Sequence, residues 1–201
     1  MDQRANAWIA AVISVPEAVE TASIPVSQPP ITGAALPQKG IPEPDAADRL
    51  VRRYFSGSSS VWIVGVHGGA GESALTHLID GSRSTQHAWP VFKDTDEAPR
   101  VLLLCRSNRA GLEAARRALI EWAAPNQLNV DLLGLAVMAD APGKLPKLLR
   151  DLETIVGGGA PRLWRLPWVE TWRTGNVQAE HLPREIRKFI TDIRSLLPDN
   201  R

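Results

Sequence analysis

Four short apolar runs, separated by segments with helical spacing, constrain the fold of this chain most strongly. The runs are residues 61–66, 101–105, 132–138 and 163–166. Each has the length of a strand, and such continuous apolar runs are typical of strands buried on both faces of a parallel sheet. Because these runs alternate with helical segments, we predict an α/β domain with a small, mainly parallel sheet flanked by helices.

Helical signals fill the segments between and around the runs. Apolar residues recur at helical spacing in residues 112–122, 145–156 and 186–197. Ser107 or Asn108 can cap the first of these helices, Pro146 and Pro183 suit the first turns of the other two, and glycines 157–159 end the second. We therefore expect three amphipathic helices, the last of them ending the domain.

Two regions are less regular. Leu50, Val51, Tyr54 and Phe55 recur at helical spacing between Pro44 and Gly57, which predicts a further helix. Residues 74–79 read as a short helix, and residues 80–100 are polar and irregular, with a short strand expected at 89–92.

The first 43 residues differ in composition from the rest. They are rich in Pro, Ala, Ser and Thr and carry few large apolar side chains after Ile13. Such a segment cannot bury enough surface to offset its chain entropy, so we predict a mostly disordered leader over 1–43 and a folded domain over 44–201. Residues 8–15 are the exception, because this apolar stretch can dock on a partner or on the domain.

Charge and cysteine content exclude several function classes. The chain has 201 residues, 23 basic against 22 acidic, and a formal net charge of +1, which argues against bulk electrostatic capture of nucleic acid or anionic lipid. A single cysteine, Cys105, cannot form an internal disulfide or a thiolate metal site. The apolar stretch at 7–13 is too short to span a bilayer. We therefore expect a cytoplasmic protein without membrane insertion.

The glycine-rich segment 67–73, His-Gly-Gly-Ala-Gly-Glu-Ser, lies between a predicted buried strand and a predicted helix. In this position glycines allow backbone N–H groups to converge on an anion. The candidate phosphate contacts are Gly68, Gly69, Ala70, Gly71, Glu72 and Ser73. The alternative is a tight strand-to-helix turn kept for packing, with no ligand.

This segment resembles the deviant Walker A motif of ParA/MinD-type P-loop ATPases, which reads Lys-Gly-Gly-x-Gly-Lys-Ser/Thr. The glycines and Ser73 match, whereas His67 takes the place of the signature lysine and Glu72 that of the phosphate-binding lysine. The resemblance implies a minimal P-loop fold, a site for ATP or ADP, and Mg²⁺ bound by Ser73. The family's acidic switch and Walker B strands lack a clear counterpart between residues 79 and 100, where Asp94, Asp96 and Glu97 follow no apolar strand.

The chain as a whole, including Trp-Arg-Leu-Pro-Trp-Val-Glu at 164–170, also resembles an uncharacterised actinobacterial family associated with mobile and conjugative elements. That resemblance implies a cellular context in conjugation or partitioning and no particular chemistry.

Glu72 decides how the loop can act. A unit charge pair at about 4 Å is worth roughly 4 kcal/mol at an effective dielectric near 20, so exchanging lysine for glutamate turns attraction into repulsion of similar size. We therefore assign no catalytic residue, require no cofactor, and expect a non-hydrolysing pseudo-ATPase. The alternative is a nucleotide-dependent switch or weak ATPase that binds ATP or ADP with Mg²⁺ through a cation from elsewhere, the candidates being Arg106, Arg109 and Lys144.

Tryptophan is over-represented, with seven residues beside one Tyr and three Phe. Trp and Arg alternate in one segment, whose members are Trp164, Arg165, Trp168, Trp172 and Arg173. These residue types are enriched at interface hot spots, although core packing explains tryptophans equally well. We predict an interaction or scaffold protein with a protein partner, and the resemblance leaves a homodimer open. A DNA-binding accessory protein is the second alternative, and the near-neutral charge disfavours it.

Overall fold

The computed structural model describes residues 28–93, 95, 97–124 and 128–198. Its centre is a five-stranded sheet with the order β3-β2-β5-β6-β7, in which every neighbouring pair is parallel. The strands are β2 (Val61–Gly65), β3 (Ser82–Ser84), β5 (Arg100–Arg106), β6 (Asp131–Met138) and β7 (Leu163–Leu166). The predicted α/β class is confirmed. The four apolar runs form β2, β5, β6 and β7, which are neighbours in this sheet.

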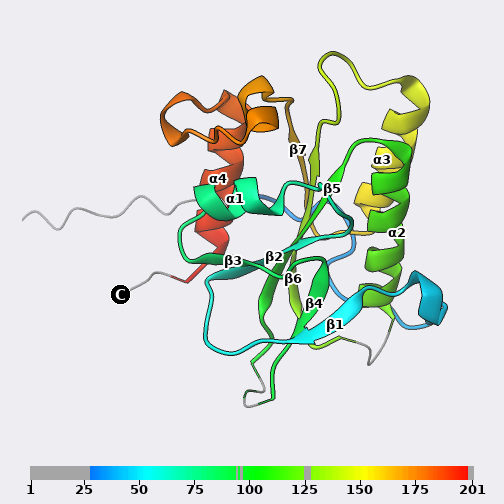
Figure 1. Ribbon diagram of the computed structural model, residues 1–201. Helices are drawn as coiled ribbons and strands as arrows, with labels where there is room; N and C mark the ends of the chain where they lie inside the picture. Colours follow the sequence, from blue (N-terminus) through cyan, green and yellow to red (C-terminus); the bar gives the residue numbers. More distant parts are fainter. Residues whose placement is uncertain (1–27, 94, 96, 125–127, 199–201) are drawn as a thin grey trace, which may run out of the picture.

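Helices cover both faces of the sheet (Figure 1). They are α1 (Glu72–Leu78), α2 (Arg109–Ala123), α3 (Lys147–Gly158) and α4 (Arg184–Leu196), with two 3₁₀ turns, η2 (Glu170–Thr174) and η3 (Ala179–His181), before α4. One core cluster joins the sheet to α1 and α4, and a second joins it to α2 and α3. The sheet is thus buried on both sides, which explains why its strands are continuously apolar.

A local signal explains where α2 begins. The Asn108 side chain accepts a hydrogen bond from the backbone N–H of Gly111 at 2.8 Å, so Asn108 is the cap of α2.

The apolar stripe predicted for α3 divides in two. Leu149 and Val156 pack against the sheet, whereas Leu148 and Ile155 are 82% and 72% exposed.

The prediction of a helix over residues 44–57 is wrong. The chain instead forms a 3₁₀ turn at Ala46–Asp48 and a strand, β1 (Val51–Tyr54), which pairs in parallel with β4 (Ala88–Val91). β4 confirms the short strand expected at 89–92, while the polar strand β3 was not predicted. Val51 and Tyr54 have high strand propensity, and pairing with β4 outweighs their helical spacing.

Glu121, on α2, explains why this segment follows the domain surface. Its fully buried carboxylate accepts hydrogen bonds at Oε2 from the backbone N–H of Leu50 at 3.0 Å and from Trp89 Nε1 at 2.9 Å. The Arg52 guanidinium lies 3.6 Å from Oε1. One buried carboxylate therefore holds both β1 and β4 against α2.

The described part of the leader, residues 28–43, lies on the domain. The backbone N–H groups of Thr32 and Ala34 donate to the carbonyls of Pro161 and Gly158, and Gln38 N–H donates to Ala123. A Cβ at Gly33 would lie 2.2 Å from the Ala160 oxygen, so only glycine fits this close approach. The apolar stretch at 8–15 lies outside the described residues.

Within the described residues, none of the helices is long and apolar enough to cross a membrane.

The single thiol, Cys105, is buried in β5. Its burial raises its pKa to about 12, with a smaller contribution from the negative charge of Glu153.

We expect Cys105 to be inert towards iodoacetamide at pH 8 in the folded protein and to react once the chain unfolds, because only the thiolate is nucleophilic. Its raised pKa also means that its contribution to stability is complete below the unfolded value of about 9 and is lost as the pH rises towards 12. Alkylation followed by mass spectrometry checks the first point, and rapid native labelling would contradict it.

Candidate functional site

The glycine loop runs from the end of β2 to the start of α1, at the carboxyl edge of the parallel sheet. In open α/β sheets this edge is where ligand sites form. Gly69 and Gly71 adopt positive φ angles of 76° and 108°, and a Cβ at Gly71 would lie 2.8 Å from Met138 Cε. The structure therefore contains the strand, glycine loop and helix in the order the sequence predicts.

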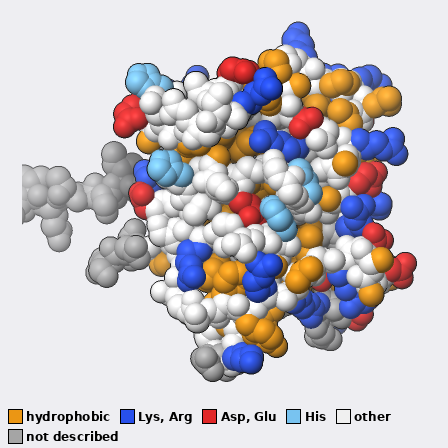
Figure 2. All heavy atoms as spheres, viewed as in Figure 1, with side chains coloured by type: hydrophobic (Ala, Val, Ile, Leu, Met, Phe, Trp, Pro, Cys, Tyr) orange, Lys and Arg blue, Asp and Glu red, His pale blue; other side chains and the backbone are white. Residues whose placement is uncertain are grey.

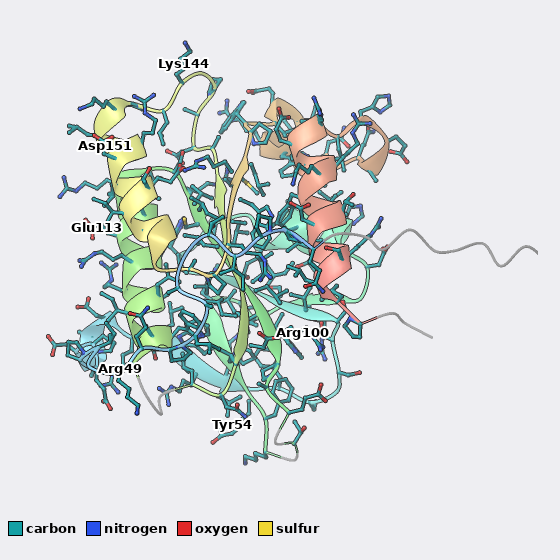
Figure 3. All side chains as sticks on the ribbon, turned by 180° about the vertical axis from the view of Figure 1, so that it is seen from behind. Arg49, Tyr54, Arg100, Glu113, Lys144 and Asp151 are labelled. Carbon is teal, nitrogen blue, oxygen red and sulfur yellow. The ribbon has the colours of Figure 1, made fainter. Side chains whose placement is uncertain are left out.

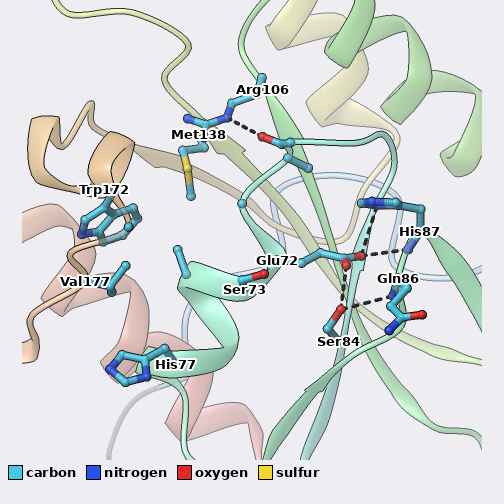
Figure 4. Close-up of a pocket in the computed structure, with 15 residues that line it drawn as sticks. Glu72, Ser73, His77, Ser84, Gln86, His87, Arg106, Met138, Trp172 and Val177 are labelled. Carbon is cyan, nitrogen blue, oxygen red and sulfur yellow. Dashed lines mark hydrogen bonds and ion pairs between the residues drawn. The ribbon is translucent and has the colours of Figure 1, made fainter.

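Glu72, in the place of the phosphate-binding lysine, turns inward and is only 7% exposed. Its Oε1 accepts hydrogen bonds from the backbone N–H of Gly65 and, at 3.1 Å, from that of His87. Its Oε2 accepts a bond from Ser84 Oγ at 2.7 Å (Figure 4). The carboxylate thus receives three donors from this chain's own residues and joins α1 to the end of β2 and to the segment between β3 and β4.

The segment that Glu72 holds is strained. Gln86 and His87 are the two non-glycine residues with positive φ in the described chain, at 54° and 61°. His87 Nδ1 lies 3.0 Å from the Gly65 carbonyl oxygen, to which it donates, and 3.6 Å from Glu72 Oε1. The Glu72 carboxylate therefore stabilises a backbone conformation that would otherwise be unfavourable.

His67, in the place of the signature lysine, also bonds inward. Its Nε2 accepts a hydrogen bond from the backbone N–H of Arg106 at 3.1 Å, and its Nδ1 lies 2.8 Å from the Gly68 oxygen. These two contacts assign the proton to Nδ1. His67 thus ties the loop to the end of β5.

Arg106 is the one of the three candidate cations that reaches the loop. Its Nε donates to the Gly69 oxygen and its terminal nitrogen to the Ala139 oxygen, each at 3.0 Å. Arg109 is exposed on α2. Lys144 lies at the tip of the loop between β6 and α3, directed away from the body of the protein (Figure 3).

Two open pockets flank Arg106 and the loop. The larger, about 820 Å³, lies between the start of α1 and the η2 region, and Trp172 and Val177 form the wall opposite the loop (Figure 4). The exposed Ser73 and His77 line its floor. The second pocket, about 580 Å³, lies on the α2 side of the loop, and its lining includes Arg106, Arg117, Asp140 and Trp168.

The Trp and Arg segment is divided by the fold. Trp164 is buried in the core and donates from Nε1 to Asp192 at 3.1 Å, so it is not a surface residue. Arg165 pairs with the buried Glu153, and Trp172 packs partly against the core.

Trp168 and Arg173 remain together at the surface. Trp168 Nε1 donates to Glu170 Oε2 at 2.8 Å, and the Arg173 guanidinium carbon lies 5.9 Å from the Trp168 ring centre. Arg173 also pairs with Glu170 at 3.3 Å. The predicted contact surface is therefore reduced to this small cluster, formed by Trp168 and by Glu170 and Arg173 of η2.

The residues present do not fit a magnesium nucleoside triphosphate. The pocket beside the loop holds a fixed carboxylate, Glu72, where the resembled family has a lysine. Ser73, the residue expected to bind Mg²⁺, lines the same pocket. Asp94 and Asp96 lie outside the described residues.

Comparison with known proteins gives a family but no activity. Residues 59–190 match the family of unknown function DUF6668. This range is well over half of the 201-residue chain. The chain belongs to that family. It matches no curated protein and no solved structure. The matched range contains the glycine loop, Arg106 and the Trp168 cluster, so every feature of the candidate site belongs to the DUF6668 domain.

Proposed function

We propose that this DUF6668 protein is a non-hydrolysing pseudo-ATPase similar to ParA/MinD-type proteins, which acts as an interaction or scaffold protein in a conjugation or partitioning system of a mobile element. One observation supports the proposal. Glu72 stands at the sequence position where the resembled motif has its phosphate-binding lysine, and its carboxylate is bonded by Gly65, Ser84 and His87.

Electrostatics supports a loop that works without nucleotide. A phosphate brought to the loop would meet a buried negative charge instead of an ammonium group, at a cost of several kcal/mol for a close approach. The donors from Gly65, Ser84 and His87 lie outside the loop and hold the carboxylate, and hence its negative charge, in place beside it. The loop thus stabilises the domain, and its function is carried by the surfaces around it.

The Trp168 cluster is the surface best suited to a protein partner. Its guanidinium and carboxylate lie on the 3₁₀ turn η2, and its aromatic ring comes from Trp168 just before that turn, in the lining of the second pocket. Trp and Arg are the residue types that most often dominate binding energy at interfaces. On the face seen in Figure 2, Lys and Arg side chains are interspersed with Asp and Glu, which favours a protein partner over DNA.

We expect Trp168→Ala to change the free energy of unfolding by no more than about 1 kcal/mol while weakening partner binding at least tenfold, as for a hot-spot residue. Chemical denaturation and cross-linking from cell extracts measure the two effects. Thr174→Ala, at the end of the neighbouring turn η2, is the matched control. A variant that binds every partner as the wild type does would remove this surface from the proposal.

An assay of phosphate release tests whether the protein hydrolyses ATP. With ATP and Mg²⁺, we expect the purified protein to release phosphate no faster than a Ser73→Ala variant. Turnover in the wild type that Ser73→Ala abolishes would overturn the proposal and would favour the weak ATPase.

A further inference from the structure

The pocket between the loop and Trp172 contains a positioned cation without a carboxylate partner. Arg106 has five N–H donors, and two of them donate to the Gly69 and Ala139 carbonyl oxygens. Among the described residues, no Asp or Glu forms an ion pair with Arg106. The backbone contacts fix the guanidinium and leave the rest of its planar fork available to a ligand.

The surroundings of Arg106 suit one kind of ligand. Figure 4 shows the guanidinium beside Met138, at the rim of the pocket that Trp172 and Val177 wall on the other side. The volume of about 820 Å³ lies in the usual range for small-molecule sites. A ligand with a short apolar body can contact Trp172, Val177 and Met138 and present an oxyanion to Arg106.

The charges in the pocket limit that oxyanion to a single negative charge. Arg106 and Glu72 are the charged side chains in its lining apart from histidine. Glu72 is already solvated by its three donors, but it still repels a polyanion. One guanidinium matches one carboxylate in charge and in bidentate geometry, whereas a triphosphate carries several uncompensated charges.

We propose that this pocket binds a small organic carboxylate, with its charged group on Arg106 and its apolar or aromatic body against Trp172. This inference rests on the proposed function in one respect, that the pocket is not a nucleoside triphosphate site. It goes beyond that function because a scaffold needs no ligand, whereas a carboxylate seated between the loop and η2 would make the adjacent contact surface sensitive to a metabolite.

Matched probes test the proposal by titration of the full chain, followed by NMR of the tryptophan indole N–H signals. We expect phenylacetate to bind at least about tenfold more tightly than phenylacetamide, which lacks the charge, and more tightly than acetate, which lacks the ring. Arg106→Gln should remove the preference for phenylacetate over the amide. Arg109→Gln, which changes an exposed arginine outside both pockets, should keep it.

A second variant keeps the test decisive if Arg106→Gln disturbs the loop. Trp172→Leu leaves Arg106 in place and should remove the preference for phenylacetate over acetate while acetate binding stays unchanged. Equal binding of phenylacetate and its amide, or an unchanged preference in Arg106→Gln, would overturn the carboxylate site and leave the proposed function standing. Tighter binding of ATP with Mg²⁺ than of phenylacetate would overturn both.

Discussion

Replacing Glu72 by alanine is expected to lower the free energy of unfolding by about 3–5 kcal/mol, because three donors would lose a buried, charged acceptor. The backbone N–H groups of Gly65 and His87 would be left unpaired, and the strained turn at Gln86 and His87 would lose its tether. Equilibrium denaturation in urea measures the change as a shift in midpoint.

Two variants separate the role of Glu72 from general effects of charge removal. Asp151→Ala on α3 removes an exposed carboxylate that pairs with Lys147 at 3.7 Å, and should change stability by no more than about 0.5 kcal/mol. Glu72→Lys restores the residue of the resembled family but directs an ammonium group at backbone donors, so it should destabilise the fold as much as alanine does. A Glu72→Ala protein as stable as the wild type would show that the carboxylate does not hold the loop.

The second large effect is expected at Glu121. Glu121→Ala should cost about 3–4 kcal/mol, since it leaves the Leu50 N–H and the Trp89 indole N–H without their acceptor inside the fold. Glu121→Gln keeps a carbonyl acceptor and should cost roughly 1 kcal/mol. The loss should also appear as faster hydrogen exchange in β1, because Glu121 is what joins that strand to α2.

Glu113→Ala is the matched control, because Glu113 lies on the same helix and pairs with the surface Arg116 at 2.9 Å. It should change stability by at most about 0.5 kcal/mol and leave β1 exchange unaltered. If Glu121→Ala left both quantities unchanged, β1 would be held by strand pairing alone.

The sequence predicts β2, β5, β6 and β7 and the three long helices, because each of these strands is a continuous apolar run and each helix has a clear apolar periodicity. It fails over residues 44–57, where Val51 and Tyr54 fit either a helix or a strand and pairing with β4, more than 30 residues away in the chain, favours the strand. β3 was missed because Ser82 and Ser84 lie at the sheet edge and carry no apolar signal. Local patterns do not contain such long-range contacts.

The candidate site, like the fold, is only partly predictable from the sequence. The loop and its glycines follow from their position between a strand and a helix, and the substitution at Glu72 is visible in the sequence alone. What Glu72 binds is not visible, because Ser84 and His87 come from an irregular stretch. Likewise, sequence offers Arg106, Arg109 and Lys144 equally, and only the pairing of β5 with β2 brings Arg106 beside Gly69.

Calorimetric titration of the wild-type chain with ATP, ADP and GTP, with and without Mg²⁺, tests the central claim most directly. A loop whose lysine position is a buried, bonded carboxylate should show no Mg²⁺-dependent binding of ATP, with any dissociation constant weaker than about 1 mM. Mg²⁺-dependent binding of ATP in the micromolar range, lost in Ser73→Ala, would contradict the account and would identify the protein as a nucleotide-dependent switch.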